Sequence, residues 1–86
     1  DVKAAERATS GSIYGDATRV KGLVVSFVSG GTVVLKDGGA SGTTRFSYTA
    51  PASAGTTNIL IPGEGIRFST DVYATLSDAT VTVFYG

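Results

Sequence analysis

The sequence RVKGLVVSFVSGGTVVLK, residues 19–36, decides the fold class of this chain. Its first ten residues place apolar side chains on both faces of an extended strand, with Leu23 and Val25 on one face and Val24 and Val28 on the other. A strand that is apolar on both faces is expected at the centre of a sheet or beneath an interface. The stretch therefore predicts a β protein whose central strand begins here.

The triplet Ser-Gly-Gly at residues 29–31 interrupts this apolar run. Glycine adopts the positive φ angles that tight turns between antiparallel strands require. We therefore predict a tight hairpin at the triplet, which joins a strand over residues 19–28 to a returning strand over residues 32–36.

Further β-rich runs follow at spacings of about eight to twelve residues, a pattern typical of sandwiches and barrels. We predict strands over residues 43–49, 57–61, 66–70, 72–76 and 80–85. The predicted fold is all-β, a small antiparallel β-sandwich or jelly-roll-like domain of about six to eight strands. Alternation within the strands predicts a core of Leu23, Val25, Phe27, Val33, Leu35, Phe46, Ile59, Ile61, Ile66, Phe68, Val72, Leu76, Val81 and Val83.

The N-terminal residues differ in composition from the rest of the 86-residue chain. We expect residues 1–12 to form an arm that a neighbouring subunit orders and that folding does not require, because termini are ordered mainly when another element holds them. Residues 13–86 then form a single β-sandwich domain, since so short a chain holds one core. The chain has no Met, so we expect Asp1 to be a trimmed or processed start.

The amino-acid composition argues against most catalytic and metal-binding functions. The chain has no His and no Cys, which removes the usual general base, the commonest metal ligand and any disulfide. We predict no catalytic residue, no cofactor-binding residue, no metal site and no cofactor, and therefore no enzyme. The formal net charge is zero and no long apolar segment is present, so we expect neither a nucleic-acid nor a membrane partner.

Low charge suggests a different kind of partner. Only 16% of residues are charged, against roughly a quarter in an average domain. Four apolar side chains point away from the main apolar set of their strands, and we predict that they form an interface: Val24, Val28, Leu60 and Phe84. A chain this short gains stability by association, so we expect a homo-oligomer. A trimer is the preferred oligomer.

Four blocks in a fixed order carry a resemblance to a known group. They are RVKGLVV at residues 19–25, VVLKDGG at 33–39, NILIPGEGIRFSTDVYATL at 58–76 and VTVFYG at 81–86. With these blocks, which span about half of the chain, the sequence resembles small proteins encoded among the structural genes of tailed bacteriophages. The resemblance implies a component of the virion, assembled in the host cytoplasm, and supplies no catalytic or binding residues.

Within that class we expect a capsid cement or decoration protein that stabilises the shell, with the major capsid protein or other virion proteins as partners. A tail, neck or fibre-attachment component is the alternative within the same class. A carbohydrate-binding β-sandwich module is the alternative of another class, and it would expose aromatic side chains around a groove.

Overall fold

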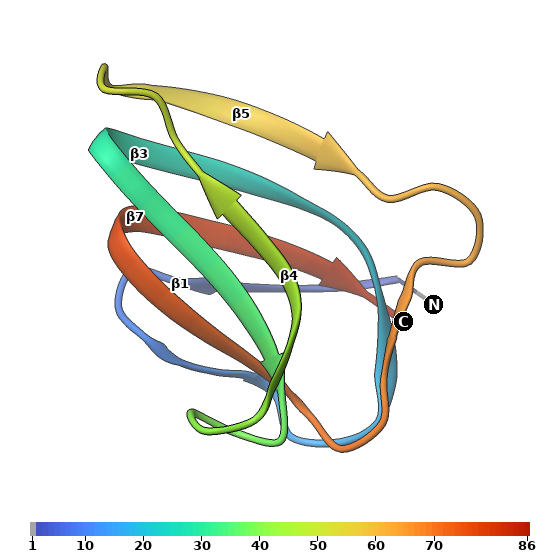
Figure 1. Cartoon of the computed structure of the whole chain (residues 1–86). Helices are drawn as coiled ribbons and strands as arrows, with labels where there is room; N and C mark the ends of the chain where they lie inside the picture. Colours follow the sequence, from blue (N-terminus) through green and yellow to red (C-terminus); the bar gives the residue numbers. More distant parts are fainter. Residues whose placement is uncertain (1) are drawn as a thin grey trace.

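The computed structural model describes residues 2–86, and Asp1, the first residue of the expected arm, lies outside the described residues. Seven antiparallel strands form one sheet (Figure 1), and the described part of the chain contains no helix. The strands are β1 (Lys3–Arg7), β2 (Gly11–Tyr14), β3 (Thr18–Asp37), β4 (Thr43–Thr49), β5 (Gly55–Leu60), β6 (Ile66–Phe68) and β7 (Val72–Tyr85). The prediction of an all-β protein is confirmed.

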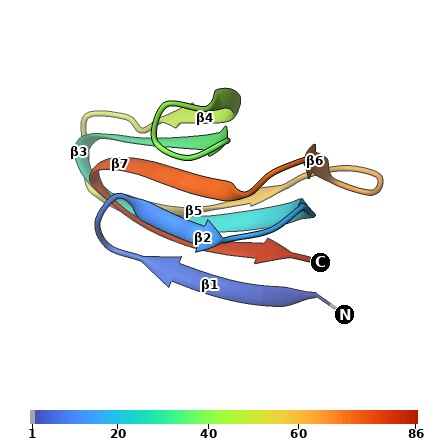
Figure 2. The same cartoon turned by 90° about the horizontal axis from the view of Figure 1, so that it is seen from below.

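Two long strands, β3 and β7, run side by side through the middle of the sheet, and both bend sharply (Figures 1 and 2). The first half of β3 pairs with β5 and β6 on the side away from β7, and its second half pairs there with β4. On the far side of β7, its first half pairs with β2 and its second half with β1. Because both long strands bend, the two halves of the sheet enclose one hydrophobic core.

The hairpin predicted at residues 29–31 is wrong, because the chain continues in one strand. Phe27 pairs with Ala79 and Thr32 pairs with Ser77, so residues 28–31 of β3 lie opposite Asp78 alone. Extra residues on one strand of an antiparallel pair bend it sharply. The turn predicted between residues 72–76 and 80–85 is likewise the bend of a single strand, β7.

Backbone conformation explains why these residues occupy the bend. Gly30 has a φ of 71° and Asp78 a φ of 51°, both in the left-handed region. A Cβ atom on Gly31 would lie 2.5 Å from the carbonyl oxygen of Asp78, so only glycine allows the two strands to approach so closely. The glycines on which the hairpin prediction rested instead allow the sharp bend of β3. A bend of this kind requires the same positive φ angles as a hairpin turn.

The predicted core is confirmed by the structure. Eight of its residues are buried: Leu23, Val25, Val33, Leu35, Phe68, Val72, Val81 and Val83. The other six are partly buried and pack against that cluster: Phe27, Phe46, Ile59, Ile61, Ile66 and Leu76. The buried cluster also contains Ile13, Val20, Ala74, Ala79 and Tyr85, which extend it to β2 and to both ends of β7.

The N-terminal residues belong to the sheet instead of forming an arm. Lys3–Arg7 pairs with the last five residues of β7, in a register that places Ala5 opposite Val83. Ala5 packs against the core, and Ile13 of β2 is itself buried. The small side chain of Ala5 lets an otherwise charged segment add an edge strand to β7, which sequence composition alone does not reveal.

Candidate interaction surface

Antiparallel register brings the four predicted interface residues onto one face of the sheet. Phe84 of β7 pairs with Gly22 of β3, and Gly22 pairs on its other side with Leu60 of β5. Val24 lies two residues beyond Gly22 on β3, so it points to the same face. Val28 comes directly after the inward-facing Phe27 and is 53% exposed, which places it at the end of this face, next to the bend. The four side chains therefore share one surface. Each was predicted to lie at an interface because it points away from the main apolar side chains of its strand.

We call this surface the outer face. It consists of Ala4 and Glu6 of β1, Thr80, Thr82 and Phe84 of β7, Gly22, Val24, Ser26 and Val28 of β3, and Thr56, Asn58 and Leu60 of β5. Its four strands span roughly 15 Å across and 20 Å along the sheet. The area is of the order of 300 Å².

The apolar side chains of the outer face are open to solvent to different degrees. Leu60 is 82% exposed and Val28 is 53% exposed, whereas Val24 and Phe84 are partly buried. Leu60 lies over Gly22, where its Cδ2 atom is 3.9 Å from the place a Cβ atom would take. An isolated exposed leucine is ordinary, but Leu60 shares its face with Phe84, which lies on the other side of Gly22, and with Val24.

The polar part of the outer face is uncharged except at one position. Glu6 at the β1 edge is its single charged residue, and most of the others are threonine, serine or asparagine. The hydroxyl groups of Ser26 and Thr56 are 3.3 Å apart and hydrogen-bond across the strands. Depletion of charge is what distinguishes the centre of a protein interface from the rest of a surface, because buried charges are costly to desolvate.

The strand β5 adds an open edge beside the outer face. Among the described residues it pairs with β3 only, and its six residues, GTTNIL, carry no charge and no proline. Native proteins usually protect an open edge with charged side chains or proline. The opposite edge follows that rule, since β1 carries Lys3, Glu6 and Arg7. The β5 edge is thus suited to contact with another chain.

One functional group that sequence reasoning missed lies at the other end of the sheet. Asp37, the last residue of β3, is buried, and its carboxylate accepts the backbone N–H groups of Ser69 and Thr70 at 2.9 Å each. Arg45 forms an ion pair with the same carboxylate at 3.3 Å. The N–H donors of Ser69 and Thr70 hold the pKa of Asp37 below its ordinary value, against the opposing effect of burial. These contacts bind two loops together.

The described residues 2–86 contain no group of three His, Cys, Asp or Glu side chains placed to hold a metal ion. None of the aromatic side chains of this part of the chain is fully exposed. Tyr14 stacks on Tyr85 with ring centroids 4.8 Å apart, and Phe27 lies 6.3 Å from Tyr48. These two contacts pack four of the aromatic rings in pairs.

Comparisons with protein-family models, with curated proteins and with solved structures found no match to this chain. The residues that the structure describes include no helix long and apolar enough to cross a membrane.

Proposed function

We propose that the chain is a non-enzymatic structural protein of a bacteriophage particle. Within the particle it acts as a capsid cement protein, with its outer face against neighbouring subunits of the shell. The observation that carries the proposal is the outer face itself, where Leu60, Val24 and Phe84 lie among uncharged polar side chains with Glu6 as the single charge. Covering such a face removes apolar area from water and buries at most one charge, that of Glu6 at the β1 edge.

The resemblance to phage structural proteins supports the same surface. Three of its four blocks contribute side chains to the outer face: residues 19–25 supply Val24, residues 58–76 supply Leu60 and residues 81–86 supply Phe84. These segments come together only through the pairing of β3 with β5 and β7. The residues on which the resemblance rests are therefore also those that build the surface proposed for contact.

The open β5 edge supports association with further chains. An uncharged edge offers unpaired backbone N–H and C=O groups to a neighbouring strand without electrostatic repulsion. In the proposed assembly, a second copy or a capsid subunit covers this edge together with Leu60. The assembly is a homo-oligomer, with a trimer preferred by analogy with cement proteins on three-fold axes.

Copy number in the particle tests this function. Particles of the phage that encodes the chain are purified, and the chain is quantified by mass spectrometry against the major capsid protein. A cement protein is expected in numbers comparable with the capsid subunits. A dozen copies or fewer would assign the chain to the tail, the neck or a fibre attachment instead. Absence from purified particles would overturn the proposal.

A further inference from the structure

Two arginines face each other at the end of the sheet where β6 joins β3. Arg19 and Arg67 are register partners in the antiparallel β3–β6 pair, which places their Cα atoms about 4.5 to 5.5 Å apart. Like charges directly opposite each other destabilise a strand pair. Within residues 2–86 the single ion pair is that of Arg45 with Asp37, and neither Arg19 nor Arg67 donates a hydrogen bond to a protein group.

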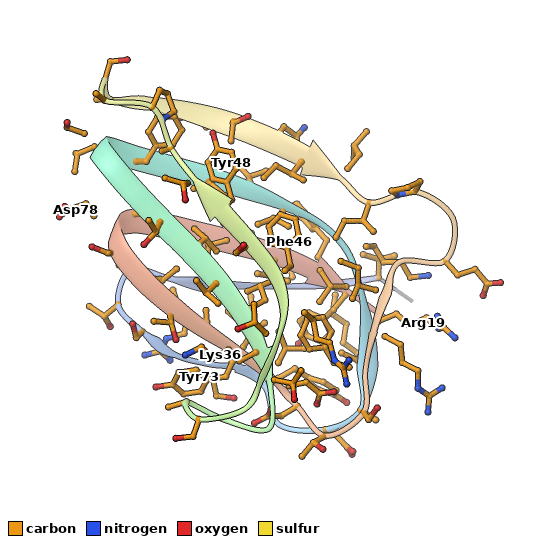
Figure 3. All side chains as sticks on the ribbon, viewed as in Figure 1. Arg19, Lys36, Phe46, Tyr48, Tyr73 and Asp78 are labelled. Atoms are coloured by element: carbon orange, nitrogen blue, oxygen red, sulfur yellow. The ribbon has the colours of Figure 1, made fainter. Side chains whose placement is uncertain are left out.

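A recess of about 320 Å³ opens beside this arginine pair, and its lining consists of Ala17, Thr18, Arg19, Arg67, Phe68 and Gly86. Phe68 is fully buried, so this wall of the recess is fixed by the core. Arg19 is fixed at its backbone, because its carbonyl oxygen accepts the N–H group of Gly86 at 3.0 Å. In Figure 3 the side chain of Arg19 extends away from the sheet, at the end of the molecule that holds the C-terminus in Figure 1.

We propose that this recess binds a compact dianion of phosphate size, held between the guanidinium groups of Arg19 and Arg67. Two guanidinium groups match the charge of a dianion, and each presents a planar fork of N–H donors that suits tetrahedral oxyanions. The bound anion neutralises the repulsion between the two side chains, so binding also stabilises the β3–β6 pair.

The charges of the site favour a phosphate dianion over a nucleic-acid backbone. Two guanidinium groups balance two negative charges, whereas a diester phosphate carries only one. The chain as a whole has zero formal net charge, so it offers no extended basic surface to a polyanion. The site does not depend on the proposed role in a virion, because it requires no second subunit.

The test is an NMR titration of the folded chain with inorganic phosphate at about pH 8, with ionic strength held constant by chloride. Saturable shifts are expected at the backbone amide signals of Thr18, Arg19 and Arg67. The variants Arg19→Gln and Arg67→Gln should each weaken binding by about tenfold or more, the effect of losing one charge-assisted hydrogen bond. Lys36→Gln, which removes a cation from the second half of β3, is the matched control and should bind like the parent chain.

Dimethyl phosphate, a somewhat larger monoanion with the same tetrahedral centre, separates a dianion site from a diester site. It is expected to bind about tenfold more weakly than phosphate. Equal binding of the two anions, or an equal response of all three variants, would overturn the proposal in favour of general ionic screening. If a variant fails to fold, the parent chain still tests the proposal. The absence of saturable shifts at Arg19 and Arg67 in the parent chain would be enough to overturn it.

The recess lining includes Gly86, so a carboxylate at that residue is a competing occupant. A chain extended by three neutral residues after Gly86 is therefore titrated in parallel. Phosphate binding to both chains supports an external ligand. Binding to the extended chain alone would show that the carboxylate of Gly86 fills the recess, which would contradict the proposal.

Discussion

Asp37 and Asp71 each hold the backbone of the other's loop. The Asp37 carboxylate accepts the N–H group of Thr70 at 2.9 Å, and the Asp71 carboxylate accepts the N–H group of Gly38 at 2.8 Å. Two loops far apart in sequence, one after β3 and one before β7, are thereby bonded in both directions. This reciprocal arrangement closes the end of the core next to β4 and predicts how stability depends on pH.

Stability should decrease in acid because of Asp37. Hydrogen bonds from Ser69 and Thr70 lower the pKa of Asp37 in the folded chain, so the unfolded chain binds the proton more readily. The stabilisation is therefore complete well above about pH 3.9, the value of an unperturbed Asp, and is lost as the pH falls through the folded value. Asp37→Asn should lower the urea midpoint at pH 7, and its difference from the parent chain should shrink towards pH 2.

Asp16→Asn is the control for this series, because the Asp16 carboxylate is exposed and accepts one hydrogen bond, from the N–H group of the adjacent Ala17. Its urea midpoint should follow that of the parent chain at every pH. A difference between Asp37→Asn and the parent chain that stays constant from pH 6 to pH 2 would contradict the assigned role of the carboxylate.

The bend of β3 should depend on the missing side chain of Gly31. Gly31→Ala places a Cβ atom against the carbonyl oxygen of Asp78, where the backbone has little room to move, and should cost about 1 to 3 kcal/mol of unfolding free energy. Gly15→Ala is the matched control, since no atom lies within 4 Å of its added Cβ atom. It should change stability by no more than about 0.5 kcal/mol in chemical denaturation. Equal effects of the two substitutions would contradict the close approach at the bend.

Removal of residues 1–7 should destabilise the isolated chain, in contrast to the expectation from sequence. The deletion takes away the strand that pairs with the second half of β7 and uncovers the core beside Ala5. Each kcal/mol lost lowers the melting temperature by about 4 to 8 °C in a domain of this size. An unchanged melting temperature would show that β1 contributes nothing to stability and that residues 1–7 act as a separate arm.

Association through the outer face predicts a mass above that of one chain. Light scattering after size-exclusion chromatography should give a multiple of 8.7 kDa, with three chains preferred. Val24→Asp combined with Phe84→Asp should dissociate the oligomer, because it introduces two charges into a face that must lose water. Ser47→Asp combined with Thr75→Asp, which lie on either side of Val34 on the outward side of the second half of the sheet, provides the control and should leave the mass unchanged. A parent chain of 8.7 kDa at micromolar concentration would contradict self-association.

Local sequence predicts the inward side chains well and the path of the chain less well. Alternation assigns Leu23 and Val25 to the core because a strand has a period of two residues, whatever its partners are. The Ser-Gly-Gly triplet at residues 29–31 suits a hairpin and a corner equally. The pairing with β7 on either side of Asp78, nearly fifty residues away, decides between a hairpin and a bend, because β7 bends there beside β3.

For the candidate surface, too, the sequence predicts individual residues but not the alignment of their strands. Sequence identifies Val24, Leu60 and Phe84 as apolar residues on the less apolar side of their strands, but it cannot align three strands with one another. Pairing at Gly22 supplies that alignment. Asp37 was missed because its partners, Ser69 and Thr70, are more than thirty residues distant. The arginine pair was missed because the register of β6 against β3 has no local signal.

The most direct measurement of the proposed role is a cryo-EM map of the intact particle of the phage that encodes this chain. We predict density for the seven-stranded domain on the shell, with Val24, Leu60 and Phe84 buried against neighbouring subunits and the β5 edge covered. A particle that holds the domain with this face open to solvent, or that lacks the domain altogether, would contradict the account.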